Sequence, residues 1–190
     1  WYLRNMKDSI KVGIIGFGTV GTGVVKVILN NRETIRRRLG IPVEIAAIAD
    51  RDLDLDRGIR IDRRLLTKDP MDVIINPDID ILVEVMGGIN PAKGYILEAI
   101  SRGKHIVTAN KALLADYGEE VYRAAEDAGV DLGFEGSVGG GIPVIKALKE
   151  GFDANRIESI FGIINGTSNY ILTKMTEEGR PFPSVLSEAK

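Results

Sequence analysis

The chain has 190 residues, of which 44% are hydrophobic and 27% charged, and its formal net charge is -2 at pH 7. These totals are typical of a globular protein with a sizeable core, and the small negative charge gives no electrostatic basis for binding nucleic acid. The absence of cysteine excludes disulfides, thiolate metal sites and cysteine nucleophiles. No apolar run approaches the roughly 18–20 residues that span a bilayer, and the N-terminus lacks the apolar core of a signal peptide. We therefore predict a cytoplasmic enzyme that binds neither membrane nor nucleic acid.

The first predicted element is a strand that ends at Gly16, where Gly16-Phe17-Gly18-Thr19-Val20-Gly21 spells G-x-G-x-x-G. Apolar residues at helical spacing follow it. In such a strand–turn–helix, Gly16 permits a tight turn, Gly18 lets the backbone approach a pyrophosphate, and Gly21 lets the helix pack closely on the strand. The helix N-terminus, at Thr19 and Val20, supplies N–H groups and a partial positive charge. The pattern predicts a dinucleotide site, and the alternative is a glycine turn with a structural role only.

A helix over residues 19–30, extending as far as the arginines at 36–38, is expected to end at Gly40. Basic residues at a helix C-terminus interact favourably with the helix dipole, so this arginine triplet is interpreted as a solvated helix end rather than a phosphate site. Residues 43–49 then predict the second strand. A strand, a helix and a strand in this order give a right-handed crossover and a parallel sheet.

Asp50 and Arg51 follow the second strand directly. An acid at this place hydrogen-bonds the adenosine ribose 2′-OH of NAD, whereas an arginine accommodates the 2′-phosphate of NADP. The two neighbours therefore favour different cofactors, and a plain strand-end turn is a third interpretation. The sequence leaves the choice between NAD and NADP open.

The next predicted elements continue the same alternation after an exposed, irregular stretch over residues 53–69. A buried strand over 79–85 ends at Met86 and Gly87, and a helix over 92–102 leads to a strand over 104–108. A strand that ends in glycine exposes its backbone at the carboxyl edge of the sheet, where cofactors bind in doubly wound folds. Met86 and Gly87 are therefore candidate cofactor residues.

The rest of the chain predicts one more helix and strand of the sheet and then a second unit. The expected elements are a helix over 116–128, a strand over 130–134, a helix over 144–149, a strand over 156–164, a helix capped at 165–169 and a final helix within 181–190. We predict an α/β fold with a doubly wound parallel sheet (Rossmann) of five or six strands in residues 1–135. An incomplete α+β catalytic or dimerisation domain follows in residues 136–190.

Three further segments accompany the glycine fingerprint: Thr108–Ala112 (T-A-N-K-A), Phe134–Pro143 (F-E-G-S-V-G-G-G-I-P) and Gly162–Tyr170 (G-I-I-N-G-T-S-N-Y). In their order and spacing they resemble homoserine dehydrogenase, from about Lys11 to the last residue. The resemblance implies NAD(P)-dependent interconversion of L-homoserine and L-aspartate 4-semialdehyde, the branch step toward threonine, methionine and isoleucine. The parent enzyme is expected to be a homodimer.

The resemblance also implies roles for individual residues. Lys111 would be a catalytic lysine that positions and polarises the substrate oxygen, where the alternative is a surface lysine that begins a helix. Thr108 and Asn110 would touch the nicotinamide. The remaining residues implied are the substrate-binding Gly166 and Thr167 and, around a monovalent cation such as Na⁺, the Glu135 carboxylate with the backbone carbonyls of Val138, Gly140 and Ile142. Helix capping at Gly166 and Thr167 and a hinge at Glu135 are the structural alternatives.

One departure from the family pattern concerns the segment that follows in similar enzymes, which supplies a substrate-binding glutamate, an aspartate and a second lysine. None of these follows Lys190. We therefore expect this polypeptide to be a fragment that binds cofactor and turns over slowly or not at all. The alternative functions are a nucleotide-binding regulatory module without catalysis and another amino-acid-pathway reductase of the same fold. His105, the single histidine, is interpreted as a core or sheet-edge residue rather than a catalytic one.

Overall fold

The computed structural model describes residues 7–162 and 165–189. The chain divides into two compact units, Trp1–Ser137 and Val138–Lys190, each of which is described by itself. The first unit contains a sheet of six parallel strands in the order β3-β2-β1-β4-β5-β6. The strands are β1 (Ile10–Ile15), β2 (Val43–Ala49), β3 (Leu66–Thr67), β4 (Ile81–Glu84), β5 (His105–Thr108) and β6 (Leu132–Gly133).

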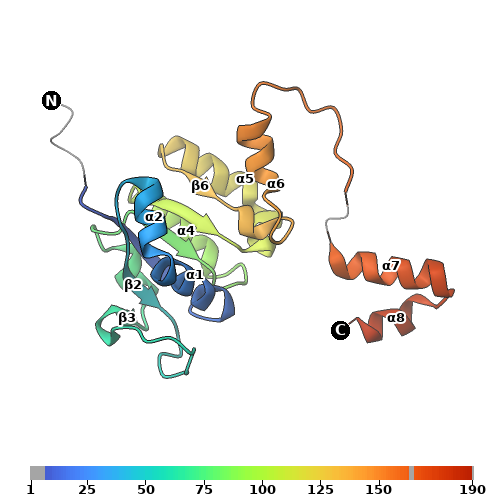
Figure 1. The fold of residues 1–190 in the computed structure, drawn as a ribbon, viewed down its shortest axis with the longest axis horizontal. Helices are drawn as coiled ribbons and strands as arrows, with labels where there is room; N and C mark the ends of the chain where they lie inside the picture. The colour runs from blue at the N-terminus through green and yellow to red at the C-terminus, as the bar shows by residue number, and fades with distance from the viewer. Residues whose placement is uncertain (1–6, 163–164, 190) are drawn as a thin grey trace. The chain divides into compact units, whose positions relative to one another are not determined.

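Helices connect these strands and cover the sheet (Figure 1). They are α1 (Thr19–Asn30), α2 (Arg32–Leu39), α3 (Pro70–Ile74), α4 (Ala92–Ser101) and α5 (Lys111–Asp127), with short 3₁₀ turns η1 (Arg63–Leu65) and η2 (Glu135–Ser137). The buried side chains form two clusters. In one, α1 packs on β1 and β2. In the other, α3, α4 and α5 pack on the opposite face of the sheet. This is a doubly wound Rossmann sheet, as predicted.

The strand register aligns the carboxyl ends of four neighbouring strands. Ile15, the last residue of β1, pairs with Ala49 of β2 on one side and with Glu84 of β4 on the other, and Glu84 pairs with Thr108 of β5. The residues that follow these strands therefore emerge at one edge of the sheet. In doubly wound folds this edge carries the ligand.

Two helix ends in the first unit differ from the sequence prediction. The helical conformation is interrupted at Asn31, so the predicted first helix is two helices. The second of these, α2, ends at Gly40 in the left-handed conformation (φ 81°), and its three arginines are exposed. The predicted helix over 116–128 begins earlier, at Lys111. The reason is a cap: the Asn110 side chain accepts a hydrogen bond from the Leu113 N–H at 3.2 Å.

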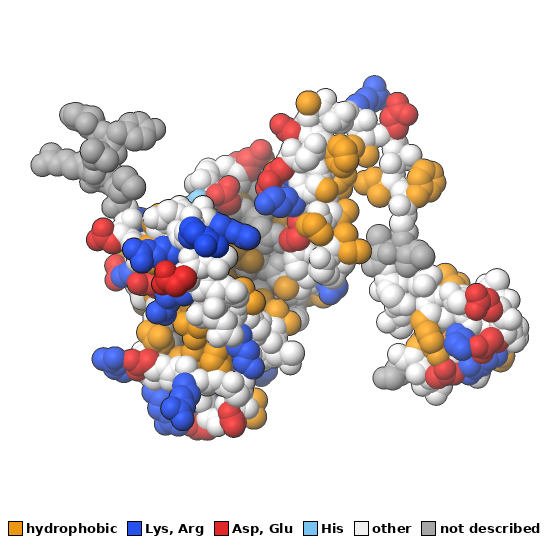
Figure 2. Space-filling model, in the orientation of Figure 1, with side chains coloured by type: hydrophobic (Ala, Val, Ile, Leu, Met, Phe, Trp, Pro, Cys, Tyr) orange, Lys and Arg blue, Asp and Glu red, His pale blue; other side chains and the backbone are white. Residues whose placement is uncertain are grey.

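The second unit consists of helices in its described part: α6 (Val144–Lys146), which continues into a π-helical turn (Ala147–Gly151), α7 (Gly166–Glu178) and α8 (Phe182–Glu188). The predicted strand over 156–164 is wrong for residues 156–162, which have no regular structure, while 163–164 lie outside the described residues. A strand needs a neighbour to satisfy its backbone, and none pairs with 156–162 among the described residues. The exposed Ile160 and Phe161 belong to this segment, where Figure 2 shows hydrophobic side chains on the surface.

Candidate active site

The glycine turn after β1 has the close contacts that its sequence predicts. Gly16 has φ +101°, and a Cβ there would lie 2.6 Å from the backbone nitrogen of Met86. A Cβ on Gly21 would lie 1.9 Å from the Gly16 carbonyl oxygen, so the first turn of α1 packs directly on the glycine turn. A Cβ on Gly18, in contrast, would meet nothing within 4 Å. Space is therefore open at the one glycine where a pyrophosphate is expected to approach.

The N-terminus of α1 fits an anion. Its N-cap residue is Gly18, no side chain caps the first turn, and no acidic residue lies in that turn. The N–H groups of the first turn of a helix have no partner within the helix and carry partial positive charge. Thr19, Val20 and Gly21 thus present the backbone that a pyrophosphate of NAD(P) requires.

Asp50 closes the other side of the turn at the end of β2. Its Oδ2 accepts a hydrogen bond from the Phe17 N–H at 2.5 Å, and its Oδ1 forms an ion pair with Arg57 Nη2 at 3.3 Å. Arg51 is exposed. Sequence reasoning missed Arg57, which lies in a charged stretch predicted to be irregular, and no local pattern marks it as buried.

Glu84 is a second residue that sequence reasoning missed. It is the last residue of β4 and its exposed fraction is 0%. The carboxylate accepts hydrogen bonds from the Met86 N–H at 3.0 Å and from the Thr108 hydroxyl at 2.7 Å, and the Asn110 amide lies 3.5 Å away. An acid at the carboxyl end of a buried strand is the signal that could have identified it, although the predicted strand over 79–85 also contains Asp80. Glu84 joins the loops that follow β4 and β5.

The three predicted residues at the end of β5 and just after it have different surroundings. Thr108 and Asn110 are buried, and the Asn110 amide also donates to the Gly88 carbonyl at 2.5 Å. Both side chains therefore connect the end of β5 to the end of β4 and the loop that follows it. Lys111 begins α5 and is exposed. In the loop after β4, Met86 is half-buried and Gly87 is exposed with φ +73°. The sheet thus brings Gly16, Asp50, Met86, Thr108 and Lys111 to one edge.

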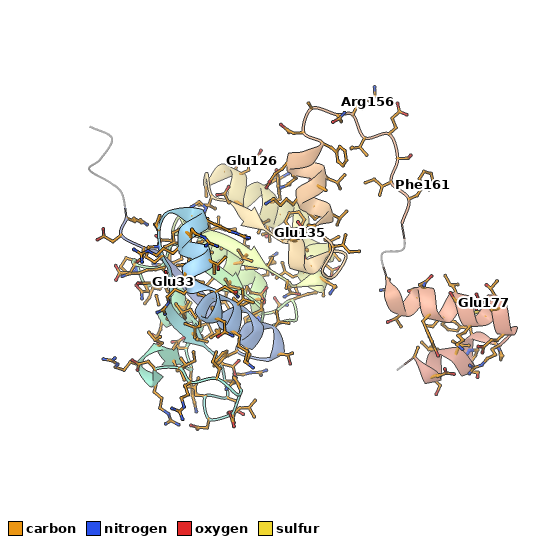
Figure 3. The ribbon with its side chains drawn as sticks, viewed as in Figure 1. Glu33, Glu126, Glu135, Arg156, Phe161 and Glu177 are labelled. Carbon is orange, nitrogen blue, oxygen red and sulfur yellow. The ribbon has the colours of Figure 1, made fainter. Side chains whose placement is uncertain are left out.

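The remaining predicted residues lie in different parts of the chain. Glu135, labelled in Figure 3, begins η2 in the first unit. Val138, Gly140 and Ile142 belong to the second unit. The Ile142 carbonyl already accepts a hydrogen bond from the Val144 N–H at 2.8 Å. Gly166 and Thr167 are exposed at the start of α7, whose N-cap Asn165 accepts from the Ser168 N–H at 2.8 Å. A helix N-terminus is therefore present at the predicted substrate residues.

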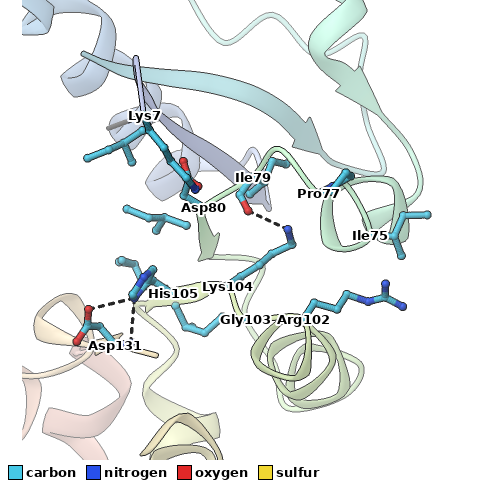
Figure 4. A pocket seen from close by; sticks show the side chains of 15 residues that line it. Lys7, Ile75, Pro77, Ile79, Asp80, Arg102, Gly103, Lys104, His105 and Asp131 are labelled. Atoms are coloured by element: carbon cyan, nitrogen blue, oxygen red, sulfur yellow. Dashed lines mark hydrogen bonds and ion pairs between the residues drawn. The ribbon is translucent and has the colours of Figure 1, made fainter. Parts of the chain in front are cut away.

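A hollow in the first unit lies at the amino-terminal ends of the strands, opposite the glycine turn. A cavity of about 850 Å³ is lined by residues at the start of β4 and β5, among them Asp80, Lys104 and His105 (Figure 4). Lys104 is buried and donates to the carbonyls of Asn76 and Ile79 at 2.6 and 2.9 Å. Burial lowers its pKa, although Asp80 acts in the opposite direction. His105 is the first residue of β5, at the end of the strand away from the glycine turn, and its Nδ1 lies 3.0 Å from the Asp131 carboxylate.

The described residues contain neither a metal-binding cluster of side chains nor a membrane-spanning helix. Within 7–162 and 165–189, no group of three or more His, Asp or Glu side chains could hold a metal ion. Among those same residues, no helix has both the length and the apolar character needed to cross a bilayer.

The parallel sheet, the glycine turn and the uncapped helix define a dinucleotide-binding protein of the Rossmann class. The family follows from sequence: residues 16–135 match the model for the homoserine dehydrogenase NAD-binding domain, and residues 143–190 match the model for homoserine dehydrogenase. The chain belongs to the homoserine dehydrogenase family.

Relatives support this assignment along almost the whole chain. The chain is 50% identical to a homoserine dehydrogenase of Pseudomonas aeruginosa over 183 residues, which are 95% of this chain and 41% of that protein. With the Bacillus subtilis homoserine dehydrogenase it is 44% identical over 182 residues, 96% of this chain and 42% of that protein. The chain therefore spans about two fifths of the length of these relatives.

Solved structures agree with the fold. The homoserine dehydrogenase from Thiobacillus denitrificans superposes with a TM-score of 0.85 at 49% identity, over 95% of this chain and 42% of that one. A hyperthermophilic archaeal homoserine dehydrogenase in complex with NADPH has a TM-score of 0.71 at 25% identity, over 96% of this chain and 60% of that one.

Proposed function

We propose that this chain is the cofactor-binding part of an oxidoreductase that interconverts L-homoserine and L-aspartate 4-semialdehyde with NAD(P). Family membership supports the substrate class. The single observation that carries the proposal is the strand register, because it brings Lys111 to the edge where the glycine turn and Asp50 emerge. We further propose that the protein is cytoplasmic and acts in the biosynthesis of threonine, methionine and isoleucine. The parent enzyme is proposed to be a homodimer.

Lys111 is the proposed catalytic residue. When bound, NAD(P) exchanges a hydride with the carbon that bears the substrate oxygen. The Lys111 ammonium donates a hydrogen bond to that oxygen and stabilises the negative charge that develops on it as the carbonyl is reduced. Its place at the N-terminus of α5 adds the positive end of a helix dipole to the same region.

The buried groups beneath the edge are proposed to hold the nicotinamide subsite. Glu84 joins Met86 to Thr108, and Asn110 joins Gly88 to the first turn of α5. We assign the nicotinamide contacts to Met86, Gly87, Thr108 and Asn110. Because their side chains are occupied in protein hydrogen bonds, Thr108 and Asn110 act mainly by fixing the loops.

Further ligand-binding residues are proposed from the family resemblance. Gly166 and Thr167, at the N-terminus of α7, contact the substrate, whose carboxylate suits a helix N-terminus. A monovalent cation such as Na⁺ is bound by the Glu135 carboxylate and by the carbonyls of Val138, Gly140 and Ile142. Ligands that are all oxygen suit a hard cation.

Two measurements test the proposal. Titration of the 190-residue chain with NADPH, followed by nicotinamide fluorescence, should saturate. Replacing the matching segment of the Bacillus subtilis relative, which is 44% identical over 182 residues, with this chain should give an enzyme that oxidises homoserine. In that chimera, Lys111→Met should lower kcat by about 100-fold or more while the Kd for NADPH changes by less than about threefold.

The outcomes separate the candidate functions. Cofactor binding without turnover in a folded chimera would favour a nucleotide-binding regulatory module. Turnover of another semialdehyde in preference to aspartate semialdehyde would indicate a different reductase of the same fold. An unchanged kcat in Lys111→Met would remove Lys111 from the proposed chemistry.

A further inference from the structure

The side chain of Arg57 is buried, although most residues of the charged connection between β2 and η1 are exposed. Only 6% of its side chain is exposed. The guanidinium lies over the Phe17 ring, 4.5 Å from the ring centroid, and its Nε donates to the Phe17 carbonyl. The other nitrogens donate to the backbone carbonyls of Leu55 and Asp52. These contacts immobilise the guanidinium against the glycine turn.

The same guanidinium faces the Asp50 carboxylate. Arg57 Nη2 lies 3.3 Å from Oδ1, which also accepts a hydrogen bond from the Asp52 N–H at 2.9 Å. Oδ2 accepts from the Phe17 N–H at 2.5 Å. Both carboxylate oxygens are thus fixed, and the negative charge at the end of β2 has a fixed positive partner.

This pairing changes what the acid does to a cofactor. A free carboxylate at the end of the second strand hydrogen-bonds a ribose 2′-OH and repels a 2′-phosphate, which carries a charge of about -1.5 to -2 at neutral pH. Repulsion between such charges at short range is substantial even near a protein surface. A carboxylate paired with a fixed guanidinium forms a neutral unit and loses most of that repulsion.

We propose that Arg57 neutralises Asp50 and thereby allows the adenosine end of the site to accept the 2′-phosphate of NADP(H). Arg57 is then a positioning residue for cofactor specificity, since it acts through Asp50. The exposed Arg51 is left free to face the phosphate itself. The inference rests on the proposed dinucleotide binding and adds the choice of dinucleotide to it.

A charge cycle on the 190-residue chain tests this role, with the Kd of NADPH and of NADH measured for each variant. Arg57→Gln should weaken NADPH by about tenfold or more and NADH by less than about threefold, because only NADPH carries a 2′-phosphate that the unpaired carboxylate repels. The double variant Asp50→Asn with Arg57→Gln should return NADPH to within about threefold of the wild type. Asp50→Asn alone should raise the preference for NADPH.

Arg63→Gln is the matched control. Arg63 begins η1, at the end of the same connection, and pairs with Asp54 at 3.2 Å, but both side chains are more than 80% exposed, at 84% and 81%. Its loss should leave both Kd values unchanged. Arg57→Lys keeps the positive charge but loses the forked contacts of the guanidinium. It tests the role of the charge even where Arg57→Gln does not fold, and it should keep the ratio of the two Kd values within about threefold.

Three results would overturn the inference. Equal weakening of NADH and NADPH by Arg57→Gln would mean that Arg57 only packs the loop. A double variant no better than Arg57→Gln would exclude charge compensation. A shift in the ratio for Arg57→Lys as large as for Arg57→Gln would do the same. If the wild-type chain binds neither dinucleotide, the proposed function fails together with the inference, and that result is distinct from the other three.

Discussion

Asp80, at the start of β4, shows how one buried charge contributes to stability. Its side chain is 13% exposed, accepts a hydrogen bond from the Lys11 N–H at 2.8 Å and pairs with Lys7. Burial by itself raises the pKa of the carboxyl, but the Lys11 N–H and the Lys7 ammonium outweigh burial and bring the pKa below its ordinary value of 3.8. The charged form is therefore favoured more in the folded state than in the unfolded state.

This shift predicts a pH dependence for Asp80→Asn. A carboxyl whose pKa is lower in the folded state stabilises the fold above its unfolded pKa, and that stabilisation is lost as the pH falls through the folded pKa. The variant should lose about 1–2 kcal/mol of unfolding free energy at pH 7, since the exposed Lys7 adds little. Below pH 3.8 the difference from the wild type should shrink. Urea unfolding between pH 7 and pH 3 measures the loss at pH 7 and its decrease at low pH. Asp78→Asn is the control, because the Asp78 side chain is 70% exposed.

A difference between wild type and Asp80→Asn that stays constant down to pH 3 would contradict this account. It would mean that the contacts of Asp80 do not distinguish its charged form from its neutral form.

At the scale of elements, the junction of β1 and α1 separates two roles of glycine. Gly18 has ordinary dihedral angles (φ -73°) and open space around it, so Gly18→Ala should keep the unfolding free energy within about 0.5 kcal/mol. It should weaken NADPH by about tenfold or more, because the methyl group takes the space that the pyrophosphate needs. Gly21→Ala should instead destabilise the fold by about 2 kcal/mol or more, because its Cβ would meet the Gly16 carbonyl.

Gly23→Ala is the control for both variants. Gly23 lies within α1, is exposed and has nothing within 4 Å of a Cβ. Alanine there should stabilise the helix by about 0.5–1 kcal/mol and leave the NADPH affinity unchanged. If Gly18→Ala binds NADPH as well as Gly23→Ala does, the pyrophosphate does not approach the chain at Gly18.

The elements that the sequence predicted best are those whose signals are local. Apolar periodicity and glycine punctuation identified β2 and α4 closely, because each has a clear apolar pattern between recognisable stops. The start of α5 was missed by five residues because its Asn110 cap belongs to a segment interpreted for chemistry rather than for capping. The predicted strand over 156–164 fails for 156–162 because strand formation depends on a partner that local alternation does not reveal.

At the scale of the whole molecule, the fold class and the site edge were predictable, whereas the contacts within the site were not. The glycine turn and the order of the strands suffice to place Lys111 near the expected cofactor. The contact of Arg57 with Phe17 spans 40 positions in sequence, and the bond of Glu84 to Thr108 spans 24. Such pairs arise from packing across the sheet, so a single sequence shows the charged residue but not its partner.

The irregular segment over residues 156–162 predicts where a protease cuts. Phe161 is 93% exposed and lies in residues 156–162, which have no regular structure, whereas Tyr122 is 44% exposed within α5. Proteases cleave exposed irregular backbone first, and chymotrypsin prefers aromatic side chains. Within residues 7–189, the first cut should therefore follow Phe161, as mass spectrometry of brief digests would show, and Phe161→Ala should slow it. The N-terminal product should bind NADPH with an affinity within about threefold of that of the uncut chain. A first cut in α5, or a product that no longer binds NADPH, would refute an independently folded cofactor unit.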